Sequence, residues 1–292
     1  YGMKQGGKRV RPLLTLIAAD MFSGDVNKAK SAAIAVEILH NFTLLHDDIM
    51  DQSPLRRGKE TVYKKFNSNK AILSGDTMFA ISYKHLLNYD KEIIKDLVEI
   101  LTQSSIEVCE GQAFDMEFET RNDVKIEEYI NMIRLKTGVL LSCALRLGAV
   151  TAHCSKENLE LLNEFALNIG IAFQIQDDIL DCWSDVEVFG KITGKDIIDN
   201  KKTFLYLKAL EIGSQRQQNI LQELYSSKNF EPAQKEQVVK SIYEDLKIKE
   251  LAEKEMLHYH NLAIQSLEKI DIDNQRKENL RRFSEKLINR NK

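Results

Sequence analysis

The sequence predicts an all-α fold, and three observations support that prediction. Apolar residues recur at three- and four-residue spacing along almost the whole chain, as they do on the buried face of an α-helix. Prolines, which end or kink helices, number only 3 among the 292 residues. The chain has no runs of β-branched residues with period two, the pattern typical of strands. We therefore expect about ten or more helices in a single domain that spans residues 1–292.

The expected helices follow one another along the chain, separated by short polar breaks. The apolar pattern predicts helices over residues 13–21, 32–43, 71–87, 93–118, 126–149, 156–183 and 204–210. Ser23-Gly24-Asp25 is a turn between the first two of these, and Asn88-Tyr89-Asp90 breaks the third from the fourth. In the C-terminal third, Glu and Lys alternate as they do on solvated helix faces.

Composition excludes several classes of function. A hydrophobic content of 43% is ample for a buried core, and a net charge of −3 gives no reason to expect nucleic acid or an anionic membrane as a partner. The chain has no run of 18 uncharged apolar residues, so we expect no transmembrane segment. The 4 cysteines lack C-x-x-C spacing and fit packed thiols in a reducing compartment, so we expect a cytoplasmic protein. Because the chain starts at Tyr1, we also expect a truncated N-terminus.

Two copies of a D-D-x-x-D pattern stand in apolar surroundings, one at residues 47–51 and one at 177–181. On a helix, the first and last aspartates of each copy share a face, and like charges at that spacing destabilise the helix by roughly 0.2–0.5 kcal/mol. Bound cations would offset this repulsion. Oxygen-only ligands favour Mg2+, which binds through one or two carboxylates together with water and substrate phosphates. One copy alone would fit an exposed acidic face, but two copies predict a metal-dependent diphosphate site.

Basic residues supply a second, independent line of evidence for a phosphate-binding site. Lys8, Arg9 and Arg11 follow two glycines and precede Pro12, an arrangement that places cations beside a helix N-terminus, where phosphates bind well. Arg56-Arg57-Gly58 follows the first acidic copy by five residues and offers guanidiniums suited to bidentate phosphate contacts. Either cluster alone would fit a solvated loop. Their placement around the acidic copy favours phosphate binding.

Together these residues resemble the trans-isoprenyl diphosphate synthases, also called polyprenyl synthetases. The resemblance covers residues 6–205: G-G-K-R-x-R-P, D-D-x-x-D followed by R-R-G, then K-T, then F-Q-x-x-D-D-x-x-D, and finally G-K with a further lysine. It implies the all-α isoprenoid synthase fold around a central active-site cavity. It also implies a Mg2+-dependent, head-to-tail condensation of isopentenyl diphosphate with an allylic diphosphate: dimethylallyl, geranyl or farnesyl diphosphate.

The resemblance assigns roles position by position. The carboxylates that it implies for about three Mg2+ ions per site are those of Asp47, Asp48, Asp51, Asp177, Asp178 and Asp181. Of these, Asp47, Asp51 and Asp177 match the principal ligands. The residues that match the isopentenyl diphosphate site are Lys8, Arg11, His40 and Arg57. Those that match the surroundings of the allylic diphosphate and its cationic transition state are Arg56, Lys136, Thr137, Gln174, Lys191 and Lys201, with Lys136, Thr137, Gln174 and Lys201 as the catalytic residues.

Phe42 and Thr43 are the expected determinants of product length. Phe42 precedes Asp47 by five residues, so on a helix it lies roughly 7.5 Å along the axis and could floor the tunnel for the growing chain. In the family, an aromatic residue at this position with a small neighbour such as Thr43 resembles producers of geranylgeranyl diphosphate. We therefore favour that product, with farnesyl diphosphate second. Phe42 could equally be an ordinary core residue.

Other interpretations stay open at this stage. A terpene cyclase shares the aspartate-rich metal chemistry, but its usual Asn/Ser/Glu metal motif is not found here. A noncatalytic subunit of a heteromeric prenyl synthase would typically lose the acidic motifs, and a structural helical protein would leave their combination with basic residues unexplained. The resemblance suggests a homodimer through helices such as 72–87 or 93–109. The roles of Lys195, Gln112, Asp115 and the basic C-terminal tail remain open.

Overall fold

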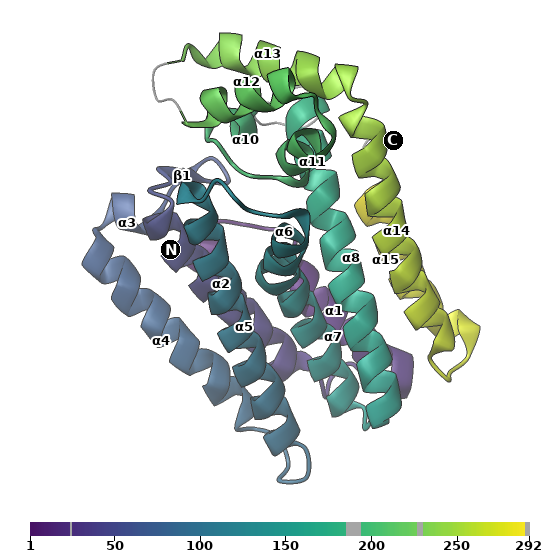
Figure 1. The fold of residues 1–292 in the computed structure, drawn as a ribbon. Helices are drawn as coiled ribbons and strands as arrows, with labels where there is room; N and C mark the ends of the chain where they lie inside the picture. The colour runs from purple at the N-terminus through teal and green to yellow at the C-terminus, as the bar shows by residue number, and fades with distance from the viewer. Residues whose placement is uncertain (24, 185–193, 227–229, 290–292) are drawn as a thin grey trace. The chain divides into compact units, whose positions relative to one another are not determined.

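The computed structural model describes residues 1–23, 25–184, 194–226 and 230–289, and nearly all of its regular structure is helical (Figure 1). In chain order the helices are η1 (Gly2–Lys4), α1 (Val10–Ser23), α2 (Lys30–Met50), α3 (Val62–Lys65), α4 (Ser68–Leu86), α5 (Ile94–Thr120), α6 (Ile126–Ile133), η2 (Arg134–Gly138), α7 (Val139–Thr151), α8 (Lys156–Trp183), α10 (Lys195–Ile198), α11 (Phe204–Ile212), α12 (Gln215–Ser226), α13 (Pro232–Asp245), α14 (Ile248–Lys269) and α15 (Asn274–Ile288). The all-α prediction is confirmed.

The observed helix bounds follow the apolar pattern closely, with one interruption. α8 runs from Lys156 to Trp183 as predicted, and Ser155 begins it, since its hydroxyl accepts a hydrogen bond from the Asn158 amide at 3.2 Å. The stretch predicted as one helix over residues 126–149 is instead α6 and α7 joined by η2, a single π-helical turn. Such turns insert an extra residue and are frequent at functional sites. This one contains the K-T pair.

A two-residue hairpin, which the sequence pattern did not predict, follows the first acidic motif. β1 (Leu55–Arg56) pairs antiparallel with β2 (Lys59–Glu60), and Arg56 stands opposite Lys59. The two residues between the strands, Arg57 and Gly58, have φ angles of +54° and +73°. Positive φ at both central positions is typical of a type I′ turn, which matches the twist of paired strands. The hairpin fixes where the two consecutive arginines emerge.

The chain divides into two compact units, and the single-domain assignment remains a prediction. The first unit comprises Tyr1–Ile106, Leu140–Glu164 and Leu267–Leu280, and the second comprises Glu107–Val139, Phe165–Ser266 and Arg281–Lys292. In the first unit, α2 packs against α1 and α4. The face of α2 that carries Ala32, Ala35, Val36 and Leu39 is fully buried, which explains the four-residue recurrence of apolar side chains in this segment.

The second unit has its own apolar core. Tyr129 of α6, Ile175 of α8, Phe204 of α11, Val239 of α13 and Ala252 of α14 all belong to one buried cluster. This core surrounds the C-terminal half of α8, which carries the second acidic motif. Burial of that half of the helix therefore fixes the motif's rotation about the helix axis.

The four cysteines are free thiols. Cys143 and Cys182 are buried, and burial raises the pKa of their thiols to about 11 and about 12, so both stay protonated at neutral pH. The prediction of packed thiols is thus confirmed for these two, whereas Cys109 is exposed. Within the described ranges, no helix combines the length and apolar character needed to cross a membrane.

Candidate active site

The first acidic motif lies at the C-terminal end of α2. Asp47 and Asp48 belong to its last turn, and Asp51 follows it, with its backbone amide donating to the Asp47 carbonyl at 2.9 Å. Asp51 is exposed, the Asp47 carboxylate is partly exposed, and Asp48 is buried. Carboxylates at a helix C-terminus are disfavoured by the helix dipole. The motif therefore presents Asp47 and Asp51 to solvent at a position where negative charge lowers the stability of the helix.

Arg56 of the hairpin binds this motif. Its Nε donates to Asp48 Oδ1 at 2.6 Å, and its Nη2 donates to Asp47 Oδ2 at 3.0 Å. Burial raises the pKa of Asp48, and the guanidinium opposes that rise. The hydrogen bonds of Asp48 thus hold Arg56 in place. Asp47 and Asp51 are the more accessible carboxylates of the motif.

A second group of cations surrounds His40, which lies two turns before Asp47 on α2. Arg11 of α1 donates from Nη1 to His40 Nε2 at 3.1 Å. Burial first, and then the charges of Arg11 and three further arginines, hold the pKa of His40 well below its usual 6.5. The imidazole is therefore neutral, with Nε2 as acceptor, so its proton lies on Nδ1 and can be donated to another acceptor.

Arg11 itself is prepared for an anion. Burial lowers its pKa to about 10, so the side chain remains charged at neutral pH. Its Nε is a buried donor that makes no hydrogen bond within the parts of the chain that the structure describes. A buried, unsatisfied charged donor is costly, and an anionic ligand would satisfy it.

The glycine pair at residues 6 and 7 shapes the approach to this cluster. Arg57 donates from Nη1 to the carbonyl oxygen of Gly6. Gly7 has φ of +124°, and a Cβ built on it would lie 2.7 Å from Arg57 Cζ. Only glycine allows both the backbone conformation and the close approach of the guanidinium. Lys8 follows and is exposed, and α1 begins at Val10, as expected for cations at a helix N-terminus.

Phe42 lies on α2 one turn before His46, and its ring is half-buried. It contacts His46 edge to face at 4.8 Å between ring centroids, and it contacts Phe79 of α4 at 5.3 Å. Thr43, the small residue beside Phe42, donates its hydroxyl proton to the His40 carbonyl at 2.8 Å. That proton is therefore not available to a ligand in the space beside Phe42.

The second acidic motif lies in the last two turns of α8, and its middle aspartate is buried in the second unit. Asp178 accepts hydrogen bonds from the Tyr129 hydroxyl, from Gln174 Nε2 at 3.4 Å and from the Phe204 amide at 3.4 Å. Burial, followed by the nearby charge of Asp196, raises the pKa of Asp178 well above its usual value. Asp178 thus joins α6, α8 and α11.

The outer aspartates of this motif are less buried. Asp177 and Asp181 are each partly exposed. The carboxylate of Asp181 accepts a hydrogen bond from the Asp196 amide, at 3.0 Å, in the first turn of α10. The second motif therefore repeats the division seen in the first, with one buried aspartate in the middle and two accessible ones.

The K-T pair lies beside the second motif within the second unit. Thr137 donates its hydroxyl to Gln174 Oε1 at 3.2 Å, and Gln174 in turn contacts Asp178. Lys136 pairs with Asp115 of α5, Nζ to Oδ2, at 2.5 Å. The approach of α5 to η2 requires Gly111, because a Cβ there would lie 2.5 Å from the Lys136 backbone nitrogen. Asp115, whose role the sequence left open, is thus the partner of Lys136.

The remaining predicted residues are placed as follows. Lys201 is exposed and stands in the loop between α10 and α11. Lys195 is exposed at the start of α10, with its Nζ 3.8 Å from Asp199 Oδ2. Gln112 is half-buried on α5. Lys191 and the end of the basic tail lie outside the described residues.

The carboxylates fit a hard cation such as Mg2+ by their chemistry. Each motif offers carboxylate oxygens at helical i, i+4 spacing and contains neither cysteine nor histidine. Within the described ranges, no three His, Cys, Asp or Glu side chains converge closely enough to form a complete metal cage. Mg2+ does not require one, since it is usually held by one or two carboxylates together with water and substrate phosphates.

Sequence reasoning missed two residues at the second motif. Tyr129 shares a hydrogen bond with Asp178 across 49 residues of sequence, and its burial raises its pKa well above the usual value. Asp196 contributes the amide that binds Asp181. Tyr129 occupies an ordinary apolar position in the pattern of an amphipathic helix, so nothing in the sequence indicates its hydrogen bond with Asp178. Asp196 lies within the G-K-x-x-G-K-D run and could have been singled out from that context.

Comparisons with known proteins give matches over most of the chain. The sequence model of polyprenyl synthetases matches residues 1–246. A short chain isoprenyl diphosphate synthase of Methanocaldococcus jannaschii is 42% identical over 243 residues, which cover 83% of this chain and 73% of that protein. A geranylfarnesyl diphosphate synthase of Aeropyrum pernix is 40% identical over 222 residues, covering 74% and 70%. The crystal structure of a geranylgeranyl pyrophosphate synthase superposes with a TM-score of 0.94 at 43% identity, over 99% of this chain and 89% of that one.

Proposed function

This chain belongs to the polyprenyl synthetase family, and we propose that it elongates allylic diphosphates with isopentenyl diphosphate to give geranylgeranyl diphosphate. It is a short-chain prenyltransferase of a family that uses Mg2+ with diphosphate substrates. The observation that best supports the proposal is the combination, within the first unit, of metal-type carboxylates and phosphate-type cations. Arg56 contacts Asp47 and Asp48, and the adjacent Arg57 adds a positive charge near Arg11 and His40.

Isopentenyl diphosphate is assigned to the cations of the first unit. Arg11 offers a buried Nε and His40 a proton on Nδ1, while Lys8 and Arg57 lie on the adjoining loop and hairpin. A neutral histidine among guanidiniums donates a hydrogen bond to a phosphate oxygen without adding charge repulsion. These four residues together supply the charge-assisted donors that a diphosphate needs.

Ionisation of the allylic substrate is the first chemical step of the proposed reaction. Mg2+, about three ions held by Asp47, Asp51 and Asp177 with help from the other aspartates, would neutralise the departing diphosphate. Arg56, Lys136, Lys191 and Lys201 stabilise the same negative charge. The dipoles of Thr137 and Gln174, which are hydrogen-bonded to each other, stabilise the allylic cation. Exclusion of water from the site prevents quenching of that cation.

Carbon–carbon bond formation completes the reaction. The double bond of isopentenyl diphosphate attacks the allylic cation, and a proton is then lost from the resulting tertiary cation. The released diphosphate, a base that the first step produces, is the proposed proton acceptor. The product is the allylic diphosphate lengthened by one isoprene unit, and the inorganic diphosphate leaves.

The function is tested by incubating the protein with Mg2+, isopentenyl diphosphate and, separately, dimethylallyl, geranyl or farnesyl diphosphate. Mass spectrometry of the products should show geranylgeranyl diphosphate as the dominant species. A cyclic hydrocarbon formed from the allylic substrate alone would instead indicate a terpene cyclase. Lack of any product, with both acidic motifs intact, would favour a noncatalytic subunit.

The product length provides the next prediction. Phe42 is half-buried against Phe79 rather than sealed in the core, so replacing it by alanine should open space along α2. Phe42→Ala is expected to shift the products to geranylfarnesyl diphosphate and longer chains while consumption of the first isopentenyl unit stays near the parent rate. Thr43→Ser, which keeps the hydroxyl and the small size, is the matched control. An unchanged product distribution for Phe42→Ala would remove Phe42 from the role of tunnel floor.

We also propose that the protein forms a homodimer. α4 exposes Ile72, Leu73 and Ile81, and α5 exposes Ile106, all within the first unit. Such exposed apolar residues on neighbouring elements are typical of subunit interfaces. Light scattering after gel filtration should give twice the mass of the chain, and Leu73→Lys should lower it toward the monomer. A monomeric parent protein at micromolar concentration would contradict this proposal.

A further inference from the structure

The loop that carries Lys201 is held in a defined conformation by backbone contacts. The Lys201 amide donates to the Asp196 carbonyl at 2.9 Å, and the Lys201 carbonyl accepts from the Thr203 amide at 3.0 Å. Asn200, just before it, has φ of +58°, a conformation that asparagine tolerates better than most residues. Two tight turns therefore flank Lys201, and both lie within residues 196–203.

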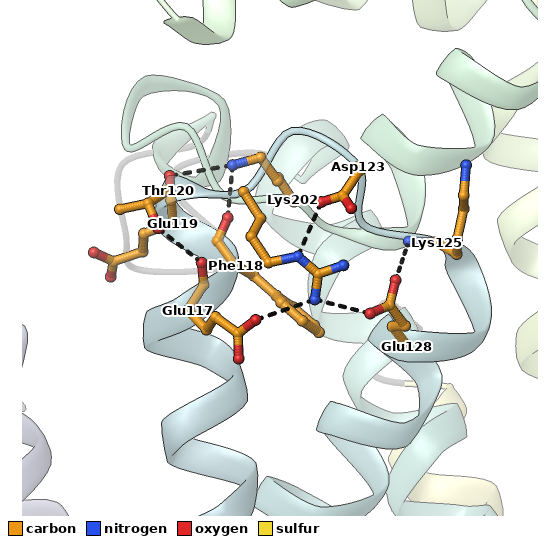
Figure 2. Close-up of polar contacts among 9 residues, drawn as sticks. Glu117, Phe118, Glu119, Thr120, Asp123, Lys125, Glu128 and Lys202 are labelled. Atoms are coloured by element: carbon orange, nitrogen blue, oxygen red, sulfur yellow. Dashed lines mark hydrogen bonds and ion pairs between the residues drawn. The ribbon is translucent and has the colours of Figure 1, made fainter.

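Lys202 connects this loop to α5. Its Nζ donates to the Phe118 carbonyl at 2.6 Å and to the Glu119 carbonyl at 3.1 Å, both in the last turn of α5 (Figure 2). The last four carbonyls of a helix have no partner within the helix and carry its negative dipole end, so an ammonium group there is doubly favourable. The contact joins positions 84 and 83 residues apart in the sequence.

The same end of α5 also holds Lys136. Asp115, which pairs with Lys136 Nζ, lies one turn before Phe118 on α5. Lys136 and Lys201, both assigned to the departing diphosphate, are thus held by contacts with the C-terminal end of α5 in the second unit. Lys136 is bound to it directly, and Lys201 is bound through its neighbour in the chain.

We propose that Lys202 is a positioning residue that sets the location of the Lys201 ammonium relative to Lys136 by anchoring the Lys201 loop to the C-terminus of α5. This inference rests on the proposed function, since it assigns Lys201 to the diphosphate. Lys202 does not itself contact substrate in this assignment, because its Nζ is bound to two α5 carbonyls.

Two further contacts hold the two ends of the same loop. Lys235 of α13 donates to the side chain of Asn200, and the Phe204 amide donates to Asp178. These contacts explain why loss of Lys202 should loosen the loop without unfolding the second unit. Lys202→Met is therefore expected to fold, with a small change in melting temperature.

The test compares three variants by kinetics and by hydrogen exchange. Lys202→Met keeps the length of the side chain but removes its donors, and Lys202→Arg keeps the charge and the donors. Arg121→Met is the matched control, because Arg121 forms ion pairs with Glu117, Asp123 and Glu128 near the same end of α5. Within the described part of the chain, none of these partners belongs to the Lys201 loop.

Lys202→Met is expected to speed amide exchange in residues 196–204 and to lower kcat about 10- to 100-fold, with KM for isopentenyl diphosphate unchanged, because a small misplacement of a catalytic group has effects of that size. Lys202→Arg should recover most of the loss, and Arg121→Met should leave both readouts at parent values. If Lys202 acts through Lys201, the double variant Lys201→Met with Lys202→Met should be no slower than Lys201→Met alone.

The outcomes separate this inference from the proposed function. Unchanged exchange in residues 196–204 of Lys202→Met would overturn the anchoring role, whatever reaction the protein catalyses. Independent, multiplicative losses in the double variant would show that Lys202 does not act through Lys201. Failure of the parent protein to elongate any allylic diphosphate would overturn the proposed function, and with it the catalytic meaning of the anchor, while the exchange data would still report whether the anchor exists.

Discussion

Replacement of Asp47 or Asp51 by alanine is expected to lower turnover by about three orders of magnitude or more. Each variant removes an accessible carboxylate assigned to Mg2+, and metal ligation of a departing diphosphate contributes several kcal/mol of transition-state stabilisation, where about 1.4 kcal/mol is tenfold in rate. The measurement is kcat for condensation at saturating substrates over a range of Mg2+ concentrations. Asp20→Ala, which removes an exposed aspartate from α1, is the control and should keep the parent rate.

Although the turnover of Asp51→Ala is expected to fall, its stability toward denaturant is expected to stay the same or to rise slightly. Its carboxylate is exposed just past the C-terminus of α2 and four residues from Asp47, so both the helix dipole and like-charge repulsion oppose it in the absence of metal. Asp51→Ala should therefore unfold at the same or a slightly higher denaturant concentration than the parent when Mg2+ is absent. A variant that is both as active as the parent and less stable would contradict the assignment of Asp51 to the metal.

Most helices could be predicted from the sequence, because each buries one apolar face and that face appears in the sequence as apolar residues three and four positions apart. α8, for example, has the predicted bounds, since a hydroxyl cap begins it and its apolar face is continuous. The hairpin at residues 55–60 was not predicted, because two-residue strands leave no periodic signal. η2 was also missed: a π-helical turn preserves the apolar character of the segment and changes only which residues face one another.

The candidate site was predictable as a set of residues, but not as a set of contacts. The motif residues Asp47, Arg56, Thr137 and Gln174 could be named from their resemblance to a family, and the structure pairs the first two and the last two. The partners that hold them come from distant parts of the chain and follow no short spacing rule. Asp115 is an exception among these partners, since it was singled out from the sequence, although without a role.

The buried position of Asp178 leads to the second large effect, a loss of stability. Asp178→Ala would leave the Tyr129 hydroxyl and the Phe204 amide without their acceptor inside the second unit, and each buried unsatisfied group costs about 1–3 kcal/mol. We expect the free energy of unfolding to fall by about 3 kcal/mol, measured by urea denaturation. Such a loss is a large fraction of the stability of an ordinary domain.

Asp178→Asn separates the structural role from a role in metal binding. The amide oxygen can take the place of Oδ2 and accept from both the Tyr129 hydroxyl and the Phe204 amide, while the NH2 group replaces only the acceptor of the 3.4 Å contact from Gln174, so most of the stability should return. Asp177→Ala, at the accessible neighbouring position, should instead lower turnover more than it lowers stability. If Asp178→Ala unfolded at the parent urea concentration, Asp178 would not join α6, α8 and α11 as the contacts indicate. If Asp178→Asn were as stable as the parent but inactive, its carboxylate charge would be required for the reaction itself.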